Sequence, residues 1–238
     1  THPIAQDTNL QKNVFFSDDS GVGQQVEYVA EYTPNSDVVP AVVNGNSIWG
    51  FRNIENAEKY MKEQGMVPML GINASYFSLE TGIPMGHVLS DGKILSKDGS
   101  TYDSIGFLED GSAFIAPLSI KTTLIFDENE VDIEHINKYP QKVVDIITLF
   151  SSDYGSETHN ECNSLILVLG DIEGEIAIGE TISATVEEKF IYEGSISIPE
   201  DKLILNINLD GKPELYETMN SLEVGDFVEI SNDTESDE

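Results

Sequence analysis

The strongest constraint on the fold is the part of the sequence from Ile94 onward, where short β-branched or aromatic segments alternate with Asp-Gly and other glycine-bearing turns. Segments of this length and composition favour strands, and turns of this kind connect neighbouring strands. Strands are therefore predicted at residues 104–108, 113–116, 121–126, 143–150, 165–169, 175–178, 181–190, 202–209 and 226–230. We expect this part of the chain to form a sheet or a small barrel.

The earlier part of the sequence predicts a strand, a helix and a second strand in succession. Residues 25–32 alternate between apolar and polar side chains, which is typical of a strand. Asn53 is positioned to cap a helix over residues 54–64, and Gly65 follows as its stop. The apolar run at 67–72 is predicted to be a buried strand. We therefore expect an α+β fold, with an early strand–helix–strand unit followed by a β-rich sheet or small barrel.

The two ends of the sequence differ from the rest in composition. Residues 1–22 are polar and rich in turn formers, so we interpret them as an N-terminal extension. Residues 231–238, SNDTESDE, contain no apolar anchor and are predicted to form a disordered acidic tail. The chain starts at Thr1 instead of a methionine, which favours a processed start and a signal peptide that has been removed.

The chain is strongly acidic, with 12 Lys plus Arg against 43 Asp plus Glu and a formal net charge of −31. Such a surface repels phosphate backbones and anionic lipid headgroups, so nucleic acid is excluded as a partner. No apolar run approaches the roughly 18 residues of a membrane span. The one cysteine, Cys162, excludes an internal disulfide, and no zinc-ligand spacing occurs. The sequence leaves the oligomeric state open.

An acidic segment provides the one candidate for a metal site, and it consists of Asp127, Glu128, Glu130, Asp132 and Glu134. It lacks the ligand spacing and the central glycine of an EF-hand loop. A solvated charged loop is the preferred interpretation, with Ca²⁺ as the alternative, and no other cofactor is predicted.

Residues 71–95 concentrate the side chains that are typical of a carbohydrate site. An amide and two aromatic rings, those of Asn73, Tyr76 and Phe77, offer the combination of hydrogen bonding and ring stacking that binds sugars. Gly82 and Gly86 would allow close approach of the backbone to a ligand. The alternative is an ordinary loop with a buried Phe77 and a capping Asn73.

The same residues resemble the phosphodiester glycosidase family, which is related to the enzyme that uncovers mannose 6-phosphate by removing N-acetylglucosamine from a phosphodiester. The segments INASYF, GIPMG and SDGKI match its hallmark in order and spacing, at residues 72–77, 82–86 and 90–94. Weaker matches to secreted Gram-positive members extend the resemblance over roughly residues 23–230, at 26–40, 105–107, 110–111, 136–138 and 154–158. On this resemblance, residues 23–126 are the N-terminal part of such a domain, and 127–230 are its β-rich part.

The resemblance implies hydrolysis of a bond between a sugar's anomeric carbon and a phosphate. This reaction needs a carboxylate to stabilise an oxocarbenium-like transition state, and a base or a positioned water. Glu80 and Asp91 are the nearby carboxylates, although Asp91 also fits an Asp-Gly turn and Glu80 a solvated loop charge. His87 suits proton transfer or a phosphate contact, and its alternative is packing at the start of a strand. Asn73 is the best single candidate, as a donor to a sugar hydroxyl or phosphate oxygen, with bracing of its loop as the alternative.

Two departures from the family pattern weaken the catalytic interpretation. Ala74 and Ser75 stand where many relatives carry an acidic residue or a glycine. The family's later motif is absent, because Asn208-Leu209-Asp210-Gly211 imitates its start but favours a β-turn. The chain is therefore expected to be the N-terminal half of a secreted, cell-wall-associated sugar-phosphodiester hydrolase. The alternative is a glycan-binding or wall-associated module without catalysis.

Overall fold

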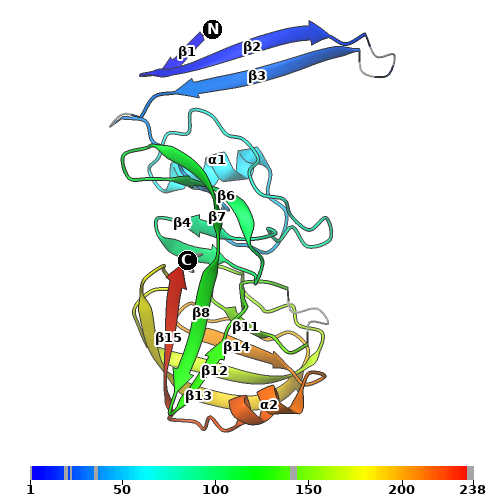
Figure 1. The fold of residues 1–238 in the computed structure, drawn as a ribbon, viewed down its shortest axis with the longest axis vertical. Coiled ribbons are helices and arrows are strands. Elements are labelled where there is room, and N and C mark those ends of the chain that lie inside the picture. Colours follow the sequence, from blue (N-terminus) through cyan, green and yellow to red (C-terminus); the bar gives the residue numbers. More distant parts are fainter. Residues whose placement is uncertain (1, 19–20, 22, 35–36, 140–143, 235–238) are drawn as a thin grey trace.

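The computed structural model describes residues 2–18, 21, 23–34, 37–139 and 144–234. Figure 1 shows three parts arranged along the long axis of the molecule: a small N-terminal sheet, a middle part with a helix and two hairpins, and a curled sheet that contains the last strand. The predicted strand at 143–150 falls partly on residues outside this description, as do residues 235–238 of the predicted tail.

The N-terminal sheet consists of β1 (His2–Ala5), β2 (Thr8–Phe16) and β3 (Gln24–Tyr32), in that order. The predicted strand at 25–32 is confirmed as β3. Residues 1–22, which were interpreted as a turn-rich extension, instead contribute two of the three strands. The reason is that every residue of β2 is paired with a residue of β3, over nine consecutive positions from Thr8↔Tyr32 to Phe16↔Gln24.

The middle part begins with the predicted helix, α1 (Ile54–Glu63). The Asn53 side chain accepts a hydrogen bond from the Asn56 backbone amide, and the Asn56 side chain accepts one from the Asn53 amide, which completes a capping box. Gly65 follows with a φ of 79°. The buried strand predicted at 67–72 is wrong: this segment is irregular, and Val67 and Ile72 are 78% and 89% exposed. No neighbouring strand pairs with it within the described residues, so its apolar character has no sheet to join.

Two hairpins complete the middle part (Figure 1). One pairs β4 (Val88–Ser90) with β5 (Lys93–Ser96), and the other pairs β6 (Tyr102–Phe107) with β7 (Ala113–Leu118). The β4–β5 turn is the predicted Asp-Gly turn, since Asp91 and Gly92 both have positive φ, at 52° and 80°.

The remaining strands form one curled, eight-stranded sheet that is half of a barrel. Its order is β10-β11-β14-β12-β13-β15-β8-β9, and every pair is antiparallel except β10 with β11. The strands are β8 (Ile120–Phe126), β9 (Asn129–Asp132), β10 (His135–Ile136), β11 (Ile147–Phe150), β12 (Asn163–Glu173), β13 (Thr181–Glu193), β14 (Leu203–Asn208) and β15 (Phe227–Thr234). Residues 175–178, predicted as a strand, contribute only an isolated bridge, Lys93↔Ala177.

The curled sheet is buried on both faces at its centre. Leu165, Leu167 and Leu205 point into the barrel interior, where they join a large apolar cluster. Their neighbours Ile166 and Ile204 point outward into a second cluster with Ile48, Ile83, Val88 and Leu95 from the first half of the chain. The outer face of the sheet is therefore the surface against which Ile83, Val88 and Leu95 pack, whereas Ile94 joins the interior cluster.

The predicted α+β class is wrong, because the protein is mostly β: strands account for 46% of it and helices for 8%. The helices of the described residues are α1 and the short α2 (Pro213–Asn220), which begins after the predicted turn at Asn208–Gly211. The predicted disordered tail is also corrected over residues 231–234. These belong to β15 and pair with β8, and the buried Asn232 side chain accepts a hydrogen bond from the Thr122 hydroxyl.

Candidate functional site

The motif residues 76–86 form a closed loop on the outer face of the curled sheet. Phe77 and Pro84 form a bridge across its base, and the Met85 amide donates to the Tyr76 carbonyl at 2.8 Å. Near its tip, the Ser78 amide donates to the Ile83 carbonyl at 2.9 Å. The loop is anchored by Ile83, which is 5% exposed and lies in the outer apolar cluster. Hydrogen bonds within the loop and the packing of Ile83 against the sheet therefore hold its backbone in place.

Both glycines of the motif lie where a side chain would not fit. A Cβ on Gly82 would come within 2.5 Å of the Gly50 carbonyl, and φ at Gly82 is 78°. A Cβ on Gly86 would lie 2.9 Å from the Tyr102 ring. The prediction for these glycines was close approach to a ligand. Their close neighbours in the structure are instead the Gly50 backbone and the Tyr102 ring of the protein itself.

Neither ring of the aromatic pair is buried in the core, so the alternative of a buried Phe77 is wrong. Tyr76 is 87% exposed, and Phe77 is 42% exposed with its ring edge-on to Phe51 at 6.1 Å between centroids. Asn73 precedes them in an exposed irregular segment. These three side chains are therefore open to a ligand, in agreement with a binding surface more than with a buried core.

The four candidate catalytic side chains do not converge. Glu80 lies exposed at the tip of the loop, and Asp91 lies exposed in the β4–β5 turn. Among the described residues, no hydrogen bond or ion pair joins any two of Asn73, Glu80, His87 and Asp91. These four side chains therefore provide no pair of carboxylates placed on either side of a scissile bond.

A buried lysine holds the base of the loop. Lys138 donates from Nζ to the Pro84 carbonyl at 2.5 Å and to the Gly86 carbonyl at 2.7 Å, and its side chain is 7% exposed. The Asp98 carboxylate lies 3.7 Å from Nζ and accepts the Gly86 amide at 2.9 Å. Burial lowers the pKa of Lys138 to about 8, although Asp98 opposes the shift. Gly86 is thus held on both its amide and its carbonyl, and we call Lys138 and Asp98 together the clamp.

Two histidines lie beside this clamp. Both ring nitrogens of His87, and Nδ1 of His135, are buried without a hydrogen-bond partner, although the Ser100 backbone lies close enough to His87 to favour its protonation. Desolvation lowers the pKa of His135 to about 4 and lowers that of His87 as well, against the attraction of Asp98. Both imidazoles are therefore neutral at pH 7, and each has a nitrogen that can accept a hydrogen bond.

The sequence analysis singled out His87 but missed Asp98, His135 and Lys138. A weak signal was present, because one of only 12 Lys and Arg residues, Lys138, lies two residues after Ile136 in a segment whose apolar side chains are interspersed with polar ones. The segment that contains Asp98 meets the segment that contains His135 and Lys138 where Lys97 and Ile136 exchange backbone hydrogen bonds at 2.9 Å. That contact brings residues about 40 positions apart together, so local patterns alone did not reveal it.

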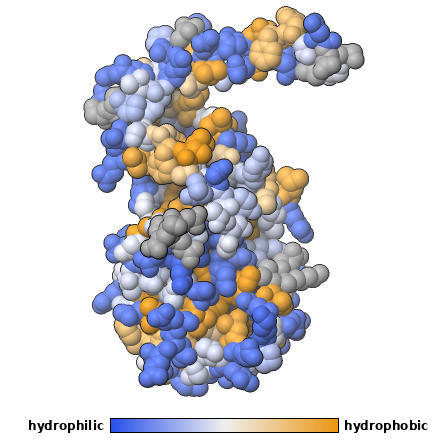
Figure 2. Space-filling model, in the orientation of Figure 1, coloured by the Kyte–Doolittle hydropathy of each residue, from blue (hydrophilic) through white to orange (hydrophobic). Residues whose placement is uncertain are grey.

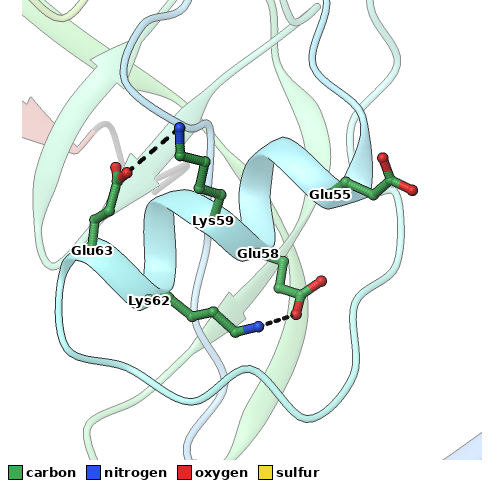
Figure 3. A pocket seen from close by; sticks show the side chains of 5 residues that line it. All are labelled: Glu55, Glu58, Lys59, Lys62 and Glu63. Carbon is green, nitrogen blue, oxygen red and sulfur yellow. Dashed lines mark hydrogen bonds and ion pairs between the residues drawn. The ribbon is translucent and has the colours of Figure 1, made fainter.

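Other concave regions offer less chemistry. Figure 3 shows five charged side chains of α1 that line a pocket, where Lys59 pairs with Glu63 at 3.8 Å and Lys62 pairs with Glu58. These are solvated ion pairs within one helix, and each is worth about 0.3–0.5 kcal/mol. Across the described ranges, no three His, Cys, Asp or Glu side chains are grouped to hold a metal ion, and this includes the described segment 127–134.

Comparisons with known proteins locate the fold and nothing finer. No protein-family model matches the chain, and no curated protein matches its sequence. A crystal structure of a hypothetical protein from Synechocystis is similar, with a TM-score of 0.67 and 15% sequence identity. The similarity covers 96% of this chain and 39% of that one, so this chain spans well under half the length of its structural neighbour. Neither helix in the described part of the chain has the length and apolar composition needed to cross a membrane.

Proposed function

We propose that residues 71–95 form one wall of a binding site for a sugar phosphodiester, in a secreted glycoside hydrolase of the phosphodiester glycosidase type. The observation that carries this proposal is the clamp on the loop. Taking a lysine out of water costs several kcal/mol, which the hydrogen bonds of Lys138 to two loop carbonyls and its ion pair with Asp98 offset. Ionisable groups buried behind an exposed loop are typical of functional sites.

The exposed side chains provide the chemistry of recognition. Tyr76 offers a ring for stacking on a sugar, and Asn73 offers an amide for a hydroxyl or a phosphate oxygen. In this proposal Gly82 and Gly86 fix the shape of the wall. Glu80, His87 and Asp91 remain candidates for the chemistry, with His87 the only one that lies next to the clamp.

A second function, glycan binding without catalysis, is favoured by one observation. The candidate catalytic groups are dispersed and their two carboxylates, Glu80 and Asp91, are exposed, so these candidates do not form an assembled pair of carboxylates. A wall that binds a sugar but does not cleave it would have this form.

The test measures release of free N-acetylglucosamine from a GlcNAc-1-phosphodiester analogue, together with binding of the same analogue by calorimetry. The measurements use this chain and any longer polypeptide of the same gene that contains it. Tyr76→Ala should weaken binding about fivefold, which corresponds to roughly 1 kcal/mol of ring stacking. Leu79→Ala is the matched control, since Leu79 is 86% exposed in the same loop.

The outcomes separate the two functions. Release of sugar that is lost in Asn73→Ala supports the hydrolase. Binding without release in either polypeptide supports the glycan-binding module. Absence of both, or equal effects of the Tyr76 and Leu79 substitutions, rejects the proposed site.

A further inference from the structure

Trp49 is the centre of a group of aromatic rings where the middle part of the molecule meets the curled sheet. Its amide donates to the Tyr154 carbonyl at 2.9 Å, and its ring packs against the outer apolar cluster of that sheet. The His159 ring stacks on it with 3.8 Å between centroids, and the Tyr139 ring lies tilted at 5.4 Å. Trp49, Tyr139 and His159, which we call the Trp49 cluster, are half-buried, so each keeps part of its surface open to solvent.

The tip of the motif loop reaches the Trp49 cluster. The Gly50 amide donates to the Thr81 carbonyl at 3.0 Å, which ties the loop tip to the residue directly after the tryptophan. Glu80 lies exposed next to Thr81, and its charge acts on the Tyr139 hydroxyl. The candidate carboxylate of the loop therefore belongs to the surroundings of the cluster.

A second carboxylate, that of Glu161, lies beside the same hydroxyl. Glu161 is exposed two residues after His159, and it accepts a hydrogen bond from the Tyr139 hydroxyl. Desolvation raises the pKa of Tyr139, and Glu161 and Glu80 raise it further, so the hydroxyl is a hydrogen-bond donor at neutral pH. His159 is held at a φ of 51°, a costly left-handed conformation of the kind that clusters at functional sites.

The groups around the Trp49 cluster select among small ligands. Two carboxylates on a chain with a net charge of −31 repel anions, so the phosphate of a phosphodiester would lie away from them. His159 covers one face of the Trp49 ring, so the rings do not form the open cage that encloses an organic cation. A sugar fits better, because its C–H face can contact the rings while its hydroxyl groups bond to the carboxylates. Figure 2 shows hydrophilic and apolar residues side by side in the middle part of the molecule, which suits a ligand of this mixed character.

We infer that the Trp49 cluster, with Glu80 and Glu161 beside it, binds the sugar ring of the substrate. This inference rests on the proposed function, because it places the sugar half of the phosphodiester. It adds Glu161 as an acceptor for sugar hydroxyl groups and Tyr139 as a positioning residue that orients the Glu161 carboxylate. Glu80 thereby gains a partner carboxylate that Asp91 does not provide.

Fluorescence of Trp49, the one tryptophan of the chain, reports on this site directly. Titration with N-acetylglucosamine should change the emission in a saturable way. Glu161→Gln should raise the dissociation constant at least tenfold, because it replaces a charged acceptor by a neutral one. Glu173→Gln is the matched control and should change it less than twofold, since Glu173 is an exposed carboxylate at the far end of β12.

The positioning role of Tyr139 is tested in two backgrounds. Tyr139→Phe should raise the dissociation constant about threefold in the otherwise unchanged chain, because Glu161 loses the hydrogen bond that orients it. In the Glu161→Gln background it should have no further effect, since the hydroxyl acts through Glu161. No effect of Tyr139→Phe, or an equal effect in both backgrounds, overturns this role.

The outcomes separate this inference from the proposed function. Binding of the phosphodiester analogue in calorimetry without a change in Trp49 emission overturns the inference and leaves the proposed function standing, as do equal effects of the Glu161 and Glu173 substitutions. A saturable response to N-acetylglucosamine that is lost in Glu161→Gln, in polypeptides that release no sugar from the diester, supports the inference and rejects hydrolysis. A response to tetramethylammonium but not to N-acetylglucosamine overturns the inference in favour of a cation site.

Discussion

Replacing His135 by phenylalanine should remove much of the acid sensitivity of the fold. Desolvation lowers the pKa of His135 from 6.5 to about 4. Between these two values the unfolded chain binds a proton that the folded chain does not, so the free energy of unfolding falls as the pH falls from 6.5 towards 4. At pH 5 this amounts to about 2 kcal/mol, and well below pH 4 it approaches about 3 kcal/mol.

The assay is urea unfolding at pH 7.5 and at pH 5, followed by fluorescence of Trp49, the one tryptophan, which packs against the outer apolar cluster. The wild type should lose about 2 kcal/mol more than His135→Phe between the two pH values. At pH 7.5 the two should agree within about 1 kcal/mol, since the substitution removes a buried nitrogen that has no partner. His2→Gln, at an exposed position, should keep the full pH dependence.

Neighbouring groups do not reverse this result. The pKa of His87 is lowered in the same direction, so the variant retains part of the acid loss. Hydrogen bonds and Lys138 hold the pKa of Asp98 below its usual 3.8 despite its burial, so its contribution is lost only at more acidic pH. An equal pH dependence in wild type and His135→Phe would refute the assignment of a neutral, buried imidazole.

Two further substitutions test the loop and its clamp. Lys138→Met leaves the largely buried Asp98 carboxylate without its cation and should lower the free energy of unfolding by about 3 kcal/mol, which corresponds to a fall in Tm of about 6–12 °C in calorimetry. The control Lys62→Met breaks a solvated ion pair and should lower it by less than about 0.5 kcal/mol. Similar losses for the two substitutions would contradict the role of Lys138 in holding the loop. A non-glycine residue with a left-handed backbone conformation costs roughly 1–2 kcal/mol. Gly82→Ala should lower the free energy of unfolding by more than this, because its Cβ would lie 2.5 Å from the Gly50 backbone. In the same urea titrations Gly179→Ala should show the conformational cost alone, since Gly179 has a φ of 77° and no atom within 4 Å of the added Cβ.

The sequence predicted those elements whose signals are local. The α1 boundaries follow from Asn53 and Gly65, and the Asp91–Gly92 hairpin from its turn chemistry. The strands of the curled sheet follow from runs of β-branched residues. The failure at 67–72 has the same origin, because an apolar run without periodicity does not reveal whether a sheet is available to it. The strands in residues 1–22 were missed because their polar alternate face obscured the pattern.

The candidate site was predicted less completely, because its geometry depends on distant contacts. The loop and His87 came from one short stretch of sequence, but Lys138 and Asp98 reach the loop through the contact between Lys97 and Ile136. Burial decides that His135 is neutral, and no local pattern encodes that burial.

The position of β15 in the curled sheet has a consequence for how the chain folds. β8, at residues 120–126, pairs only with β9 and β15 in this sheet, and Ile120 lies opposite Thr234. During synthesis the β8–β9 hairpin therefore waits until more than 100 further residues have emerged before it can join its neighbours. Contacts of such long sequence separation slow folding and leave strand edges open in the meantime. We expect the β8–β9 hairpin to join the edge of the half-barrel slowly and late, and to be the segment most exposed to mispairing on the ribosome.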